Sequence, residues 1–70
     1  MYFRIKCDYK TSEREGAGGT FQVAALYDEN DKNVTELLDQ GQHYHSLQEV
    51  CEDIAAKKMV PPEIIELEEV

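Results

Sequence analysis

Apolar and polar side chains alternate from Tyr2 to Tyr9, and this pattern predicts a β-strand. Successive side chains of a strand point to opposite faces, so we expect one face on a core and the other in water. Lysines on the polar face also suit an edge strand, where they discourage unwanted pairing. The apolar positions are Phe3, Ile5, Cys7 and Tyr9, and the polar positions are Arg4, Lys6, Asp8 and Lys10.

A second strand is predicted from Thr20 to Tyr27, and both of its faces are partly apolar. A strand of this kind fits the centre of a sheet, with a helix over one face. Something else, such as a second copy of the chain, would then cover the other face. One face carries Phe21, Val23, Ala25 and Tyr27, and the other carries Thr20, Gln22, Ala24 and Leu26.

The segment 10–19 between these strands, KTSEREGAGG, predicts a mobile hairpin loop. Its glycines add flexibility, and its polar residues keep it in water. A glycine-rich phosphate cradle needs glycines that lead into the N-terminus of a helix. Here the glycines lead into a strand, so we do not expect a phosphate site.

The segment 33–40 fits two structures. Asn33 lies three residues before Glu36, which is typical of the start of a short capped helix. The same segment also alternates as a strand would. The acidic turn 28–32 before it is short, which favours a hairpin with the second strand. We therefore expect a strand, and the helix stays open as the alternative.

An amphipathic helix is predicted from Ser46 to Lys58. Its apolar residues recur at i, i+3, i+4, i+7 and i+8, which places them on one stripe. Ser46 and Glu49 have the spacing of a capping box, and Pro61 marks the end of the helix. The stripe consists of Leu47, Val50, Cys51, Ile54 and Ala55.

Residues 63–70 predict a last strand with Ile65 and Leu67 on one face. Four acids among these eight residues leave a loose acidic tail as the alternative. With either ending, residues 1–70 form one α+β domain. We expect a small antiparallel sheet in β-β-β-α-β order, with the amphipathic helix packed on one face.

From Phe21 onward, the order of these features resembles the YegP-like domains, small ββαβ-type modules that often occur as tandem repeats. The strand FQVAAL is followed by the acidic turn DENDKN, a further strand, and the lead HYHS into the helix. The chain departs from the family where Asn30 is followed by Asp31, since the family's turn typically has Asn-Gly. The resemblance implies the fold and a tendency to pair two units into one sheet, and it implies no catalytic residues.

The charge is uneven along the 70 residues. The first 14 residues carry a balance of +2 and residues 15–70 a balance of -10, for a net charge of -8. An acidic body repels phosphates, so we expect no direct binding of nucleic acid. A chain this short buries only about 60% of its unfolded surface, which favours pairing with another chain.

No apolar run approaches the roughly 18 residues that a membrane span needs. The N-terminus also lacks the continuous apolar segment of a signal peptide, so we expect a cytoplasmic location without membrane contact. Cys7 and Cys51 do not make a disulfide framework. We expect both to be reduced and buried.

The one arrangement that could bind a metal is the pair His43 and His45, with Cys51 and Asp39 as further ligands. On a strand both imidazoles would point the same way, and a zinc site needs three or four such ligands. The spacing matches no standard zinc motif. We therefore expect two partly exposed histidines at the entrance of the helix, and no metal or other cofactor.

No set of residues predicts catalysis. Cys51 lies on the apolar stripe of the helix, and a catalytic cysteine needs a base and an oxyanion site beside it. We interpret the carboxylates that are neighbours in the sequence as surface charge. Tyr2 and Tyr44 suit a surface, and Tyr9 and Tyr27 suit the core or the rim of the sheet.

We therefore expect a protein-interaction or accessory module rather than an enzyme, with a protein partner that can be a second copy of the chain. The alternative is an acidic inhibitor, whose carboxylates imitate nucleic-acid phosphates and occupy a basic protein. That alternative requires the acids to be set in rows on the folded surface.

Overall fold

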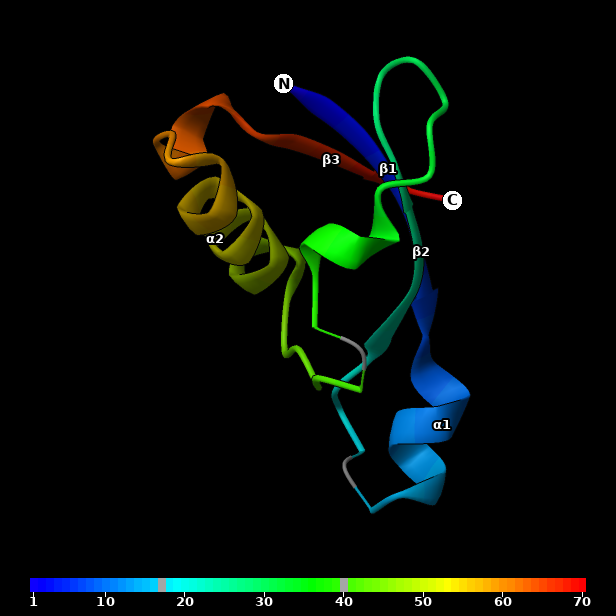
Figure 1. The fold of residues 1–70 in the computed structure, drawn as a ribbon. Coiled ribbons are helices and arrows are strands. Elements are labelled where there is room, and N and C mark those ends of the chain that lie inside the picture. Colours follow the sequence, from blue (N-terminus) through cyan, green and yellow to red (C-terminus); the bar gives the residue numbers. More distant parts are fainter. Residues whose placement is uncertain (17, 40) are drawn as a thin grey trace.

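The computed structural model describes residues 1–16, 18–39 and 41–70 (Figure 1). The predicted α+β class is confirmed, with one long helix packed against a small sheet. The strands are β1 (Tyr2–Asp8), β2 (Gln22–Tyr27) and β3 (Glu66–Glu69), and the α-helices are α1 (Tyr9–Arg14) and α2 (Leu47–Lys58). Two 3-10 helices are η1 (Thr35–Leu37) and η2 (Pro62–Ile64).

The sheet has the order β2-β1-β3 and is mixed rather than purely antiparallel. β1 pairs with β2 antiparallel and with β3 parallel. The prediction that β1 lies at an edge and β2 at the centre is therefore wrong. Alternation along a strand reports which face is buried, and it carries no information about how many neighbours the strand has.

A β-bulge explains why β2 looks apolar on both faces. Ile5 pairs with Leu26, whereas Cys7 pairs with Val23, so β2 carries one extra residue over this stretch. The extra residue shifts the alternation, and Leu26 and Val23 therefore face the same side of the sheet. The apolar residues of β2 serve one core, although their positions suggest two.

Two predictions for the connecting segments are wrong. The first half of the expected loop 10–19 continues from β1 as α1, because the Asp8 side chain accepts a hydrogen bond from the Thr11 amide and caps the helix. Over residues 33–39 the expected strand is replaced by η1, so the short helix that stayed open as the alternative is closer to the structure. There the Asn33 side chain accepts hydrogen bonds from the Thr35 amide and hydroxyl, which bends the chain locally. Residue 40 of that predicted strand lies outside the described residues.

The amphipathic helix predicted from Ser46 to Lys58 is confirmed as α2. Ser46 Oγ accepts a hydrogen bond from the Glu49 amide at 3.3 Å. In a full capping box, the Glu49 side chain would also accept a hydrogen bond from the Ser46 amide. Here Glu49 Oε1 accepts from the His45 amide instead, one residue earlier. Met59 then ends the helix in the left-handed conformation, at φ 58°. The predicted stripe is buried at Val50, Cys51, Ile54 and Ala55, and Leu47 is partly buried.

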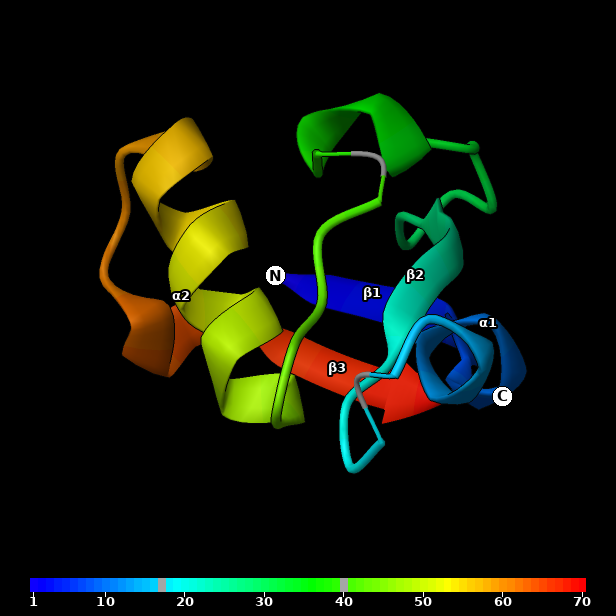
Figure 2. The ribbon, with the colours of Figure 1, turned by 90° about the horizontal axis from the view of Figure 1, so that it is seen from below.

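The core lies between α2 and one face of the sheet (Figure 2). It joins Phe3 and Ile5 of β1 to the α2 stripe, and Ile65 and Leu67 pack against the same cluster. The segment 63–70 is therefore no loose tail: it begins in η2, and Glu66–Glu69 form β3. Within the described residues, no helix is long and apolar enough to cross a membrane.

Ile54→Ala is expected to lower the free energy of unfolding by about 2 to 5 kcal/mol, because Ile54 is 0% exposed and its loss leaves a cavity. Glu52→Ala, at an exposed position of the same helix, should change it by less than about 0.5 kcal/mol. Urea denaturation followed by circular dichroism measures both. Equal effects of the two substitutions would contradict the packing described here.

Candidate functional site

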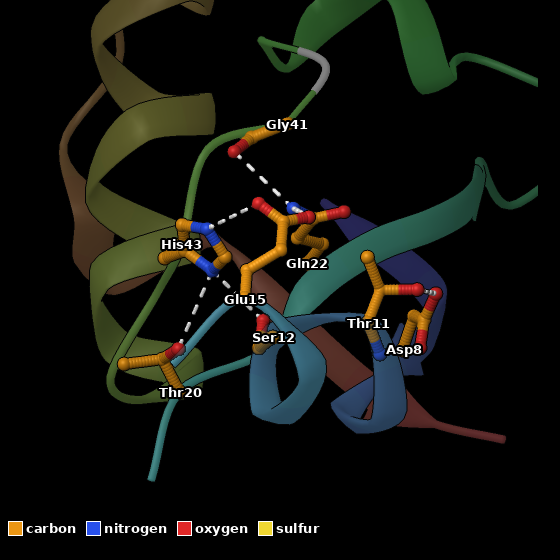
Figure 3. Close-up of polar contacts among 8 residues, drawn as sticks. All are labelled: Asp8, Thr11, Ser12, Glu15, Thr20, Gln22, Gly41 and His43. Atoms are coloured by element: carbon orange, nitrogen blue, oxygen red, sulfur yellow. Dashed lines mark hydrogen bonds and ion pairs between the residues drawn. The ribbon is translucent and has the colours of Figure 1, made fainter. Parts of the chain in front are cut away.

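A polar cluster lies where α1, the start of β2 and the segment before α2 meet (Figure 3). Its centre is His43. The ring Nδ1 lies 2.8 Å from Ser12 Oγ and 3.4 Å from Thr20 Oγ1. The ring Nε2 lies 3.6 Å from the Glu15 carboxylate, Oε2. Ser12, Glu15 and Thr20 thus contact an imidazole that lies 23 to 31 positions away in the sequence.

Local structure on both sides of the cluster sets this geometry. On the α1 side, Asp8 accepts hydrogen bonds from the Thr11 amide at 3.0 Å and hydroxyl at 2.7 Å. This cap fixes the start of α1, which then directs Ser12 inward. On the other side, the backbones of Phe21 and Tyr44 exchange two hydrogen bonds, at 2.9 and 2.8 Å. That bridge holds His43 beside the start of β2.

Serine, histidine and glutamate are the residue types of a hydrolytic triad, but this arrangement cannot present a nucleophile. A catalytic serine must reach its substrate, and Ser12 is 0% exposed. An open hollow on α1 is lined by Lys10, Glu13 and Arg14, and Ser12 is not part of its lining. The cluster therefore satisfies buried polar groups and ties α1 to the sheet.

The structure separates the residues that could have formed a metal site. His43 contacts Ser12, whereas the exposed His45 lies 3.5 Å from Glu49. Cys51 is buried on α2, and Asp39 pairs with Lys57 at 3.7 Å. Among the described residues, no three side chains of His, Cys, Asp or Glu are grouped to bind a metal ion.

Both cysteines are free thiols. Burial raises the pKa of Cys7 to about 11, and burial also raises the pKa of Cys51. A thiol becomes a strong nucleophile when its pKa is lowered. Neither cysteine is activated in this way. Cys51 is buried as expected, whereas Cys7 is only partly buried.

A second polar contact was not foreseen from the sequence. Tyr44 is 1% exposed rather than at the surface, and its hydroxyl donates a hydrogen bond to Asp53 Oδ2 at 2.5 Å. Burial is the largest cause of the raised pKa of Tyr44, and the bond to Asp53 adds to it. The contact ties the segment before α2 to α2 itself, while Lys57 lies 3.8 Å from the same carboxylate.

The acidic side chains are spread over the described surface rather than set in one row. Exposed acids lie on α1, on the turn 28–31, on α2 and on β3. This distribution does not favour the imitation of a phosphate backbone. The inhibitor hypothesis gains no support from a continuous acidic surface.

Comparison with protein-family models, with curated proteins and with solved structures found no match to this chain. The resemblance to YegP-like domains therefore stays a prediction. What the chain can do has to be argued from its own surfaces.

Ser12→Ala is expected to lower the free energy of unfolding by about 1 to 3 kcal/mol, because it leaves the His43 ring without its closest partner. The exposed Glu13→Ala, on the same helix, should cost less than about 0.5 kcal/mol. A double-mutant cycle with His43→Ala measures the interaction energy between the Ser12 and His43 side chains. Strictly additive effects in that cycle would show that the two side chains do not interact.

The cap at Asp8 should make stability depend on acid pH. Hydrogen bonds from the Thr11 side chain and amide hold the pKa of Asp8 below its ordinary value. A carboxylate with a lowered folded-state pKa stabilises the protein above its unfolded pKa, and that contribution is lost as pH falls through the folded value. Asp8→Asn should therefore remove part of the loss of stability on acidification.

The measurement is the free energy of unfolding of both proteins across the acid range. Glu52→Gln, which removes a carboxylate from the exposed side of α2, controls for the change in net charge. If Asp8→Asn and Glu52→Gln flatten the acid dependence equally, the cap is not its source.

Proposed function

We propose that this chain is a protein-interaction module that pairs with a second copy through the sheet face that α2 leaves uncovered. The observation that carries this proposal is the one-sided burial of the sheet. Both α2 and η1 lie on the same side of the strands, and within the described residues no element covers the other side (Figures 1 and 2).

The strand register defines the composition of this open face, because side chains at paired positions share a face. Arg4 is paired with Tyr27 on one side and with Glu68 on the other. The face consists of Tyr2, Arg4 and Lys6 from β1, Ala25 and Tyr27 from β2, and Glu66 and Glu68 from β3.

The open face combines aromatic surface with both signs of charge. Tyr2 and Tyr27 are partly buried and leave ring surface available, and tyrosine is enriched in protein interfaces. Its basic residues lie in a row on β1 and its acids in a row on β3. The chain as a whole carries a net charge of -8, so two copies would repel each other over most of their other surfaces.

The two rows are complementary under twofold symmetry. β1 and β3 are neighbours, so a twofold axis parallel to the strands and between them would place each basic row over the acidic row of the other copy. Arg4 also pairs with Asp31, from the turn beside the face, which orders the guanidinium. Such complementarity sets the register of an interface and disfavours wrong partners.

This proposal includes a cytoplasmic location. The two free cysteines support it, because thiols stay reduced in that compartment and disulfides are rare there. The surfaces described give no support to an enzymatic role, since Ser12, the triad-like nucleophile, is 0% exposed.

Lys6→Glu is expected to weaken self-association by about tenfold or more, because it places a like charge against the acidic row of the other copy. Lys58→Glu makes the same change at an exposed position on α2 and should leave the dissociation constant within about twofold. Sedimentation equilibrium over a wide concentration range measures both.

Two outcomes would contradict the proposal. The unsubstituted chain could remain a monomer at the highest concentration, or Lys6→Glu and Lys58→Glu could weaken the dimer equally. The second outcome would place the dimer contact elsewhere on the molecule.

A further inference from the structure

We propose that the outer edge of β3 binds an extended basic segment of another protein, which adds to the sheet as a fourth strand. The inference goes beyond self-pairing and rests on the backbone edge of β3 rather than on the open face, although the side chains of Glu66 and Glu68 belong to both surfaces. It rests on the direction of backbone groups along β3, on the closure of the opposite edge, and on the charges beside the strand.

The parallel pairing with β1 fixes which backbone groups of β3 are occupied. The Glu66 amide donates to the Met1 carbonyl at 2.7 Å, and the Val70 amide donates to the Ile5 carbonyl at 2.9 Å. In a parallel pair, alternate residues direct both their amide and carbonyl to the neighbouring strand. Leu67 and Glu69 therefore direct theirs away from β1, toward the outer edge.

The opposite edge of the sheet is closed by the chain itself. The Leu26 carbonyl accepts from the Val34 amide at 2.8 Å, and the Leu26 amide donates to Thr35 Oγ1 at 2.9 Å. The backbone bridge between Phe21 and Tyr44 covers the start of β2. No described segment takes the corresponding place beside β3 (Figure 2). An edge strand with free backbone groups is a template for pairing with another chain.

The side chains of β3 select the kind of strand that can add. Glu66 and Glu68 lie on one face of the strand, and Leu67 lies on the other face with the core. A second copy of β3 would bring glutamates against glutamates, which is destabilising. A strand that alternates basic and apolar residues would place its cations beside Glu66 and Glu68 and its apolar side chains beside Leu67.

Two tyrosines hold carboxylates of β3 in place. The Tyr2 hydroxyl donates to Glu68 Oε1 at 2.9 Å, and the Tyr9 hydroxyl donates to Glu69 Oε2 at 2.9 Å. These contacts reduce the freedom that the glutamates would lose on binding. The Glu68 carboxylate is thus positioned for a cation before a partner arrives, whereas Glu69 lies on the same face as Leu67.

The test uses the full chain, labelled with ¹⁵N, and a capped eight-residue peptide of alternating lysine and valine. NMR titration should shift the amides of Leu67 and Glu69 and slow their hydrogen exchange. A second peptide has the same side chains but carries N-methyl groups on alternate residues, which removes strand pairing and keeps the charge. It should bind at least tenfold more weakly.

A matched pair of variants tests the same contact from the protein side. Glu69→Pro removes the outward amide, and proline is tolerated on an edge strand at such a position. Glu69→Ala removes the same carboxylate and keeps the amide. Glu69→Pro should therefore bind the peptide at least tenfold more weakly than Glu69→Ala.

Equal binding of the two peptides would overturn the proposal, because attraction by charge alone does not require a strand edge. Shifts confined to the acids of α1 or of the turn 28–31 would also overturn it. If the Leu67 and Glu69 amides shift with protein concentration in the absence of peptide, the edge binds a second copy instead. The peptide comparison keeps the test decisive if Glu69→Pro fails to fold.

Discussion

The position of β1 between two strands is the constraint on which the rest of this structure depends. β1 pairs with β2, which follows it after α1, and with β3, which comes from the other end of the described chain. Only with both neighbours in place do Phe3, Ile5 and Leu67 form a surface that the stripe of α2 can cover. A domain this small buries a modest share of its surface, so a single helix layer uses most of its apolar residues.

Because a single helix layer uses most of the apolar residues, the molecule keeps open surfaces. The one long helix covers one face of the sheet, and the other face keeps its tyrosines and its rows of opposite charge. The chain closes the β2 edge itself, through the backbones of Val34 and Tyr44 and the hydroxyl of Thr35. The β3 edge has no such cover within the described residues, and it carries glutamates that oppose pairing between two copies of itself. The polar cluster around His43 is partly buried and joins α1 to the segment before α2.

The features that the sequence predicts well are those that depend on local periodicity. The stripe of α2, its Ser46 cap and the buried face of β1 follow from side-chain spacing alone. The order of strands does not, because pairing partners are distant in the sequence. The bulge opposite Lys6 and Cys7 shifts the alternation along β2, so the apolar residues of one face occupy positions that suggest two apolar faces. The sequence therefore wrongly predicts β2 at the centre of the sheet.

Other misplaced segments depend on single side chains. The helix α1 forms because Asp8 caps it, and η1 forms because Asn33 bonds to Thr35, so in both places a polar residue diverts the backbone from the expected course. The cluster of Ser12 and His43 joins residues 31 positions apart, which no local pattern reports. Tyr44 is expected at the surface from the sequence, yet its backbone pairs with Phe21 and its hydroxyl reaches Asp53.

Native-state hydrogen exchange of β3 tests whether the sheet ends in an open edge at this strand. At low protein concentration, we expect protected amides at Glu66 and Glu68, which face β1. We expect nearly unprotected amides at Leu67 and Glu69, which face outward. Equal protection of all four amides would show that the outer edge of β3 is already occupied, which would contradict an open edge.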